Sequence, residues 1–300
     1  MTQTLQGIAP ISHLGVIRVQ GDDAASFLHG QLTNDFALLD LHHARLAAFC
    51  SAKGRMQASF IGFKRAHDDI LLVLSRDLLA QTLKRLSMFV LRAKAKLSDA
   101  SADFHLLGLI GNAVPHSEQA PWALQSEGDA HIVHLYPAAG QARALWIAPA
   151  SSAAPTTTLT AAQWLWSEVA SGVATVSQPV YELFVPQMLN YESIGGVNFK
   201  KGCYPGQEVV ARSQFRGTLK RRAFIVHAQA EVQAGTEVFA ASDAEQAAGT
   251  VVQAAPAPQG GWEAIISMQI SAAPEALTAG SAIGTPLTIL PLPYTLLEDI

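Results

Sequence analysis

The spacing of apolar residues predicts helices and a buried strand in the first two thirds of the chain. After Ser75, a candidate cap, five apolar residues recur at helical intervals, which predicts a helix with a charged side toward water. The segment from Asp22, a candidate N-cap, to Gly30, a candidate helix end, predicts a short helix. A continuous apolar run predicts a strand over 70–74, and a periodic one predicts a helix over 161–169.

The pattern changes near residue 223, where short strands replace helices. Apolar runs over 223–227, 249–252 and 264–268 are separated by Gly, Pro and Ala turns. Such spacing is typical of a small β-barrel or sandwich. The sequence therefore predicts an α+β fold that ends in an all-β domain.

Composition limits the class of protein. Of the 300 residues, 49% are hydrophobic and 15% are charged, which indicates a compact globule and argues against disorder. No run reaches the ~18 apolar residues that span a bilayer. Residues 1–15 lack a basic segment followed by an apolar one, so no membrane association and no secretory signal are expected. Two cysteines suit a reducing compartment, and we expect a cytoplasmic protein.

Charge and histidine placement argue against two further classes. The net charge of −4 argues against a surface that generally attracts polyanions, so direct nucleic-acid binding is not expected. A basic run over 216–222 can attract a polyanion or protect a strand edge, and we prefer the solvated strand edge. His42, His43, His131 and His134 lack a Cys or carboxylate at metal-ligand spacing. We interpret them as loop and surface residues and expect no permanently bound metal.

The stretch Lys-Lys-Gly-Cys-Tyr-Pro-Gly-Gln-Glu over 200–208 sets Cys203 between a lysine pair and a Pro-Gly turn. Pro205 suits the first central position of a turn, and Gly206 can take the positive φ that a type II turn needs next. Neighbouring ammonium groups favour a thiolate, which predicts a reactive or ligand-binding cysteine. Free cysteines are also often small buried hydrophobes, so both interpretations of Cys203 stay open.

Three segments in the same order carry a family resemblance. Residues 186–212, which contain Lys-Gly-Cys-Tyr-Pro-Gly-Gln-Glu, resemble the signature of the YgfZ family of folate-binding proteins. These proteins are relatives of the glycine-cleavage T-protein that assist iron–sulfur enzymes. Phe-Leu-His-Gly-Gln-Leu-Thr-Asn-Asp over 27–35 and Cys-Ser-Ala-Lys-Gly-Arg-Met over 50–56 are similar to the N-terminal part of that family. The resemblance extends over 15–222.

The resemblance implies a three-domain ring like that of the T-protein, with tetrahydrofolate in its central hole and the cysteine loop nearby. It implies an N-terminal α+β part of the folate-binding region over 1–110, a second α+β part with Cys203 over 111–215, and a β-barrel over 216–300. The implied role is the assembly or repair of iron–sulfur enzymes, including radical enzymes that modify tRNA. Cys203 would be the functional thiol, and iron–sulfur client enzymes or assembly proteins the partners.

A folate needs an apolar slot with a few polar groups and a cation for its glutamate tail. The implied contacts are polar, aromatic and cationic residues of the matching segments, namely Gln31, Thr33, Asn34, Asp35, Gln187, Asn190, Lys200, Lys201, Tyr204, Gln207 and Arg212. Alternatively, Gln31 and Thr33 close the preceding helix, and Asp35 is a turn residue.

Two departures from the family pattern keep other functions open. Gln57 stands where the T-protein has an acidic group beside the folate, and an amide cannot act as a general base. Aminomethyl transfer is therefore not expected. The family's Glu-x-Gly-x-Pro stretch is replaced over 168–174, which puts the pterin contacts in doubt. A folate-dependent one-carbon transferase and a non-catalytic adaptor that has lost folate remain alternatives, and Cys50 is interpreted as a buried strand residue.

Overall fold

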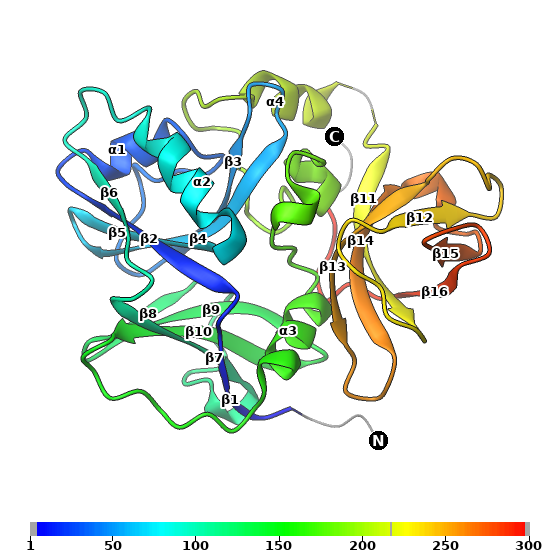
Figure 1. Ribbon diagram of the computed structural model, residues 1–300. Coiled ribbons are helices and arrows are strands. Elements are labelled where there is room, and N and C mark those ends of the chain that lie inside the picture. The colour runs from blue at the N-terminus through cyan, green and yellow to red at the C-terminus, as the bar shows by residue number, and fades with distance from the viewer. Residues whose placement is uncertain (1–4, 217, 298–300) are drawn as a thin grey trace.

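The computed structural model describes residues 5–216 and 218–297, and these form two five-stranded sheets and a closed six-stranded barrel. In Figure 1 the two sheets lie one above the other and the barrel stands beside both. The prediction of an α+β fold with a C-terminal barrel is confirmed. Among the described residues, no helix has the length and apolar character needed to cross a membrane.

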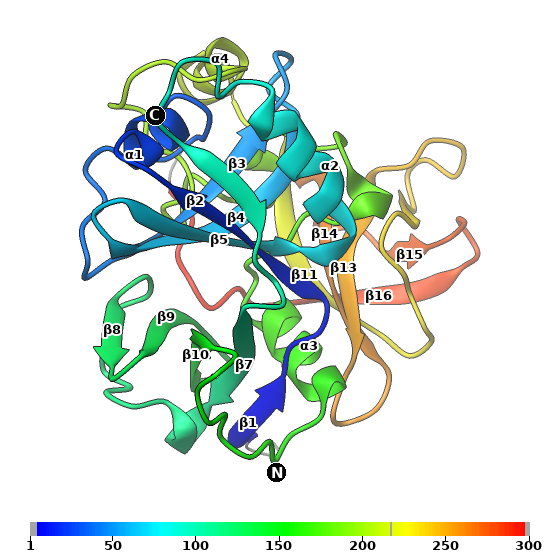
Figure 2. The same ribbon diagram turned by 60° about the vertical axis from the view of Figure 1, so that its left-hand side comes forward.

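The first sheet is antiparallel and has the order β3-β4-β5-β2-β6. Its strands are β2 (Leu14–Gln20), β3 (Ala44–Cys50), β4 (Met56–Ala66), β5 (Asp69–Ser75) and β6 (Lys96–Asp99). Helices α1 (Ala24–His29) and α2 (Arg76–Ser87) bury apolar side chains in one cluster against this sheet, on the same side of it in Figure 2.

The predicted start of α2 and the predicted end of α1 are correct, and the predicted N-cap of α1 is wrong. Ser75 is the N-cap of α2, as the sequence predicts. The N-cap of α1 is Asp23 and not Asp22. Gly30 ends this helix with a right-handed φ of −76°, because the chain turns onward through Gln31 without a left-handed residue.

The second sheet has the order β1-β7-β10-β9-β8. Its strands are β1 (Gly7–Pro10), β7 (Phe104–Ile110), β8 (Leu124–Glu127), β9 (Ala130–Ala138) and β10 (Gln141–Pro149). Residues 1–110 thus supply strands to both sheets, and the predicted domain boundaries stay a prediction. Helix α3 (Ala161–Ala170) starts with a capping box between Thr160 and Gln163 and packs between this sheet and the barrel.

The barrel closes in the order β11-β14-β13-β12-β15-β16. Its strands are β11 (Arg221–Ala228), β12 (Glu237–Ala240), β13 (Gly249–Pro256), β14 (Trp262–Gln269), β15 (Leu277–Ala279) and β16 (Thr285–Leu290). The three strands predicted from the sequence lie within β11, β13 and β14. The remaining helices are η1 (Gly111–Ala113), η2 (Gln178–Val180), η3 (Pro186–Leu189), α4 (Gln207–Phe215) and η4 (Ile270–Ala272).

Candidate functional site

The three sequence motifs come together in space. Thr33 donates its hydroxyl hydrogen to the carbonyl oxygen of Gly196 at 2.7 Å and accepts the N–H of Ala48 at 2.8 Å. Asn34 donates to the carbonyl oxygen of Gly195 at 2.6 Å. The two glycines lie 163 and 161 positions further along the chain, so the tertiary fold joins these motifs.

The Lys201 ammonium is held inside this junction. It donates to the carbonyl oxygens of His29 and Leu32 and lies 4.5 Å from the centroid of the Tyr204 ring. Both Lys201 and Tyr204 are buried, and burial lowers the pKa of Lys201 to about 8. Lys201 therefore fastens residues 200–206, here called the Cys203 loop, to the end of α1.

The predicted turn packs the Cys203 loop against the 50–56 motif. Gly206 has a φ of 81°, which confirms the predicted positive φ after Pro205. A Cβ on Gly206 would lie 2.4 Å from the carbonyl oxygen of Ser51 and 2.7 Å from the Cα of Gly54. Only glycine allows so close an approach of the two backbones.

The two cysteines differ in access to solvent. Cys203 is exposed, so its interpretation as a small buried hydrophobe is wrong. Cys50 is buried at the end of β3, as predicted, and burial raises the pKa of its thiol to about 12. The accessible thiol lies where the three motifs meet.

Several residues that are predicted folate contacts make hydrogen bonds within the protein. Gln187 is buried and donates to the carbonyl oxygen of Val210 at 2.7 Å. Asn190 is buried and exchanges two hydrogen bonds with the backbone of Ala223, at 2.9 and 3.1 Å. Asp35 lies 3.0 Å from His29. These side chains join chain segments.

The side chains of some other predicted contacts do not join distant segments of the chain. Lys200 is exposed and Gln207 is half-buried. Arg212 is exposed and pairs with Glu208 one helical turn away. The side-chain oxygen of Gln31 is buried and has no hydrogen-bond partner. None of the predicted contact residues lines the cavities described next, and folate contacts at these positions stay a prediction.

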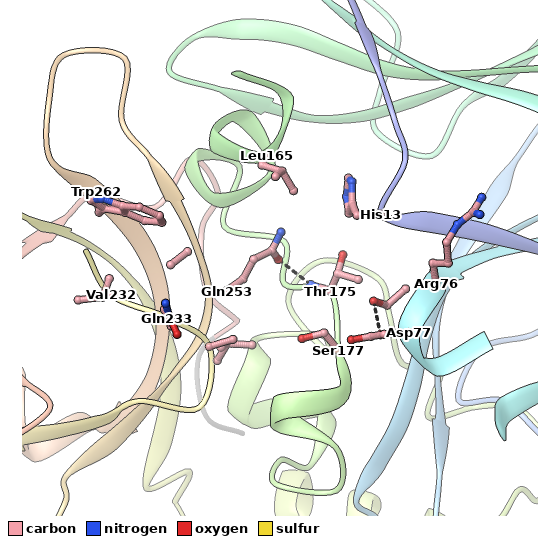
Figure 3. A pocket seen from close by; sticks show the side chains of 14 residues that line it. His13, Arg76, Asp77, Leu165, Thr175, Ser177, Val232, Gln233, Gln253 and Trp262 are labelled. Carbon is pink, nitrogen blue, oxygen red and sulfur yellow. Dashed lines mark hydrogen bonds between the residues drawn. The ribbon is translucent and has the colours of Figure 1, made fainter. Parts of the chain in front are cut away.

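A cavity of about 580 Å³ opens between the first sheet, α3 and the barrel. Figure 3 shows His13 and Arg76 on one side, Trp262 on the barrel side and Leu165 from α3. Its lining residues are His13, Ser75, Arg76, Asp77, Leu165, Thr175, Ser177, Val232, Gln233, Ala234, Val252, Gln253, Ala254 and Trp262. A cavity of this size and mixed lining suits a small organic ligand, and we call it the central cavity.

Glu168 ties three parts of the chain together at this cavity. Its carboxylate lies 3.0 Å from His13 Nε2, before β2, and accepts hydrogen bonds from Trp164 Nε1 at 2.8 Å and Gln253 Nε2 at 2.9 Å. Burial alone would raise the pKa of Glu168, but the His13 charge and hydrogen bond and the Arg143 charge lower it. Burial alone would lower the pKa of His13, but Glu168 raises it. The pair is therefore an ion pair at mildly acidic pH.

We expect the His13–Glu168 pair to raise the unfolding free energy most within a limited pH range. The Glu168 contribution is present above its ordinary value of 4.5 and is lost as pH falls, because its folded-state pKa is lowered. The His13 contribution is complete below 6.5 and is lost as pH rises, because its pKa is raised. We expect the difference in unfolding free energy between wild type and His13→Gln to be largest between these values. Urea titrations at several pH values measure it.

The control for this measurement is His43→Gln, because His43 and Asp40 form an exposed pair. Its difference from wild type should stay small across the same pH range, since exposed pairs contribute little. A His13→Gln difference that is flat from pH 4 to pH 8 would contradict the ion pair.

A narrow pocket of about 40 Å³ continues from the central cavity, and Thr175 lines both. Trp122, Tyr136, Trp164 and Glu168 contribute to its wall. Burial raises the pKa of Tyr136, so its hydroxyl stays protonated at neutral pH. The pocket combines aromatic walls with a carboxylate, and its volume has room only for water-sized molecules.

The sequence motifs do not include His13, Arg76 or Gln253. The antiparallel register of Leu14 with Ser75 places His13 and Arg76 side by side at one end of the first sheet. A signal for Arg76 was available, because it follows the apolar run over 70–74 that the sequence predicts as a buried strand. Nothing in the sequence indicates that Gln253 reaches Glu168 from the barrel.

Two other sequence interpretations need correction. His134 lies on β9 and is not a surface residue, because its side chain stands on a face of the sheet that the rest of the chain covers. Burial lowers its pKa. Arg222 in the basic run is not a solvated edge residue, since it is buried and bonds to Glu192 at 2.6 Å. Within the described ranges no group of three or more His, Cys, Asp or Glu is placed to hold a metal ion.

Comparisons with known proteins agree with this arrangement. The chain is 32% identical to the tRNA-modifying protein YgfZ of Edwardsiella ictaluri, over 93% of this chain and 89% of that protein. It is 27% identical to the protein of the same name from Serratia proteamaculans, over 95% and 91%. The crystal structure of the glycine cleavage system aminomethyltransferase T from Bartonella henselae aligns with a TM-score of 0.70 at 16% identity, over 97% of this chain and 87% of that one, and so has the same fold. No model of a protein family matches the chain.

Proposed function

The chain belongs to the family of the tRNA-modifying protein YgfZ, and from this premise we propose that it is a cytoplasmic tetrahydrofolate-binding accessory protein for iron–sulfur enzymes. Its clients would be enzymes whose clusters need assembly or repair, including radical enzymes that modify tRNA. Cys203 would be its functional thiol. The observation that carries the proposal is the single exposed thiol at the junction of all three motifs. The fold it shares with an aminomethyltransferase of glycine cleavage supports a folate ligand.

The residues of the central cavity fit a folate. Leu165 and Trp262 offer apolar walls for flat rings, and His13 and Gln253 offer polar atoms. Arg76 is exposed at the cavity wall, where a guanidinium can pair with a carboxylate of the glutamate tail. When bound, tetrahydrofolate supplies a carrier for one-carbon units. The protein residues would hold and orient it.

One-carbon transfer is a second candidate function, favoured by one observation. Gln57 is buried and donates its amide to the carboxylate of Glu182 at 2.6 Å. The fold thus brings a carboxylate beside the position where the acidic group of the T-protein is absent from this sequence. A general base there would restore one requirement of the transfer. Activity in a glycine-cleavage assay that Glu182→Gln abolishes would support this alternative.

Calorimetric titration with tetrahydrofolate carrying a short polyglutamate tail tests the proposed function. We expect binding by the wild type and a loss of about tenfold or more in affinity for Arg76→Ala, because hydrogen bonds to charged groups contribute about 1.5–3 kcal/mol. Cys203→Ala should bind like wild type, since Cys203 does not line the cavity.

The matched comparison is Lys200→Ala, which removes an exposed cation from the Cys203 loop. If Lys200→Ala weakens binding and Arg76→Ala does not, the folate lies at the motif junction and not in the central cavity. If the wild type binds no folate while a T-protein control does, the adaptor alternative replaces the proposal.

A further inference from the structure

His29 and Asp35 form a paired group beside the Cys203 loop. The Nδ1 atom of His29 lies 3.0 Å from an Asp35 carboxylate oxygen, and their side chains are 22% and 12% exposed. Burial alone would raise the pKa of Asp35, but the N–H of Leu38 and His29 lower it. The carboxylate is therefore ionised at neutral pH and accepts the Nδ1 hydrogen. In a neutral imidazole this tautomer leaves the lone pair on Nε2.

The Nε2 atom of His29 faces the backbone next to the exposed cysteine. A Cβ placed on Gly202 would lie 3.3 Å from Nε2, and Gly202 directly precedes Cys203. The Lys201 ammonium also donates to the carbonyl oxygen of His29, so backbone and ring of this histidine both meet the loop. The carboxylate-paired imidazole therefore lies one residue from the cysteine, and activated cysteines use a base that a third group orients in this way.

Other charged groups lie on the elements that pack against this loop. Lys200 and Lys201 belong to the loop itself, and Lys53 flanks Gly54 in the turn packed on Gly206. Arg55, in the same turn, donates to a backbone carbonyl oxygen, that of Leu183. On α4, Glu208 and Arg212 pair with each other. The cations can stabilise a thiolate, but among these side chains His29 alone presents an imidazole that a carboxylate orients.

We propose that His29, oriented by Asp35, is the proton acceptor for Cys203 when this thiol reacts with an electrophile. The S–H bond breaks as sulfur bonds to the electrophilic atom, the proton passes to Nε2 of His29, and the leaving group departs with its bonding electron pair. In exchange with a disulfide, the departing sulfur then takes the proton back from the imidazolium. This assignment rests on the proposed role of Cys203 as the functional thiol.

The test is the rate of alkylation of Cys203 by iodoacetamide as a function of pH, followed by mass spectrometry. We expect His29→Gln to slow the reaction about tenfold at pH 7 and to move the profile to higher pH, since a general base no longer takes the proton. Asp35→Asn keeps an oxygen for the Leu38 N–H and should give a smaller loss, about threefold. The buried Cys50 serves as the internal thiol that should stay unmodified.

Lys200→Ala separates proton transfer from simple charge effects. The Lys200→Ala variant should react more slowly over the whole pH range. The shape of its pH profile should stay that of the wild type, because His29 is still present. An unchanged profile for a folded His29→Gln protein would overturn the assignment. The reaction needs neither folate nor a client enzyme, so its failure is distinct from failure of the folate titration.

Discussion

Replacement of Glu192 by alanine is expected to destabilise the folded chain by about 3–5 kcal/mol, the usual effect of removing one partner of a buried ion pair. The side chains of Glu192 and Arg222 are 0% and 7% exposed, and their charged atoms lie 2.6 Å apart. Without Glu192 the buried Arg222 guanidinium loses its carboxylate partner. Urea-induced unfolding at pH 7 measures the loss.

The exposed pair of Glu208 and Arg212 on α4 provides the control. Their side chains are 82% and 60% exposed, so Glu208→Ala should change the unfolding free energy by less than about 0.5 kcal/mol. Equal effects of Glu192→Ala and Glu208→Ala would mean that the buried pair is solvated in solution. The large difference that we expect would confirm that Glu192 and Arg222 form a buried ion pair in solution.

Replacement of Gly206 by alanine is expected to destabilise the protein by about 2–5 kcal/mol. A residue with a side chain pays roughly 1–2 kcal/mol in the left-handed region, and overpacking adds about 1–3 kcal/mol. The added Cβ would meet backbone atoms of Ser51 and Gly54, which cannot rotate away as a side chain can. Thermal unfolding measures the loss, and hydrogen exchange of the amides over 201–207 should become faster.

Gly128→Ala is the matched control, since Gly128 has a φ of 58° and no atom within 4 Å of the added Cβ. Its unfolding free energy should fall only by the penalty for a side chain in the left-handed region, about 1–2 kcal/mol. If both variants lose the same stability, the close approach of the Cys203 loop to the 50–56 motif does not hold in solution. A greater loss for Gly206→Ala would support the observed contact between the two motifs.

The sequence by itself determined the local backbone of much of the chain. The helices at 76–87 and 161–170, the three barrel strands β11, β13 and β14, and the turn at Pro205 and Gly206 follow the predicted pattern. Helical spacing, capping and positive φ are properties of a few neighbouring residues, so they can be read without knowledge of the fold. The start of α1 could not be predicted to the residue, because Asp22 and Asp23 are equally suitable N-caps.

Only the tertiary structure decided what the polar side chains do. Thr33 and Asn34 each donate a hydrogen bond to a residue more than 150 positions away. The buried Arg222 bonds to Glu192, and Glu168 has partners from before β2 and from the barrel. A buried polar group must find a partner wherever the fold provides one. The residues next to a polar group in the sequence do not indicate which distant residue will be its partner. The motifs predicted candidate contacts, and the fold uses several of these side chains to join segments, while other residues line the central cavity.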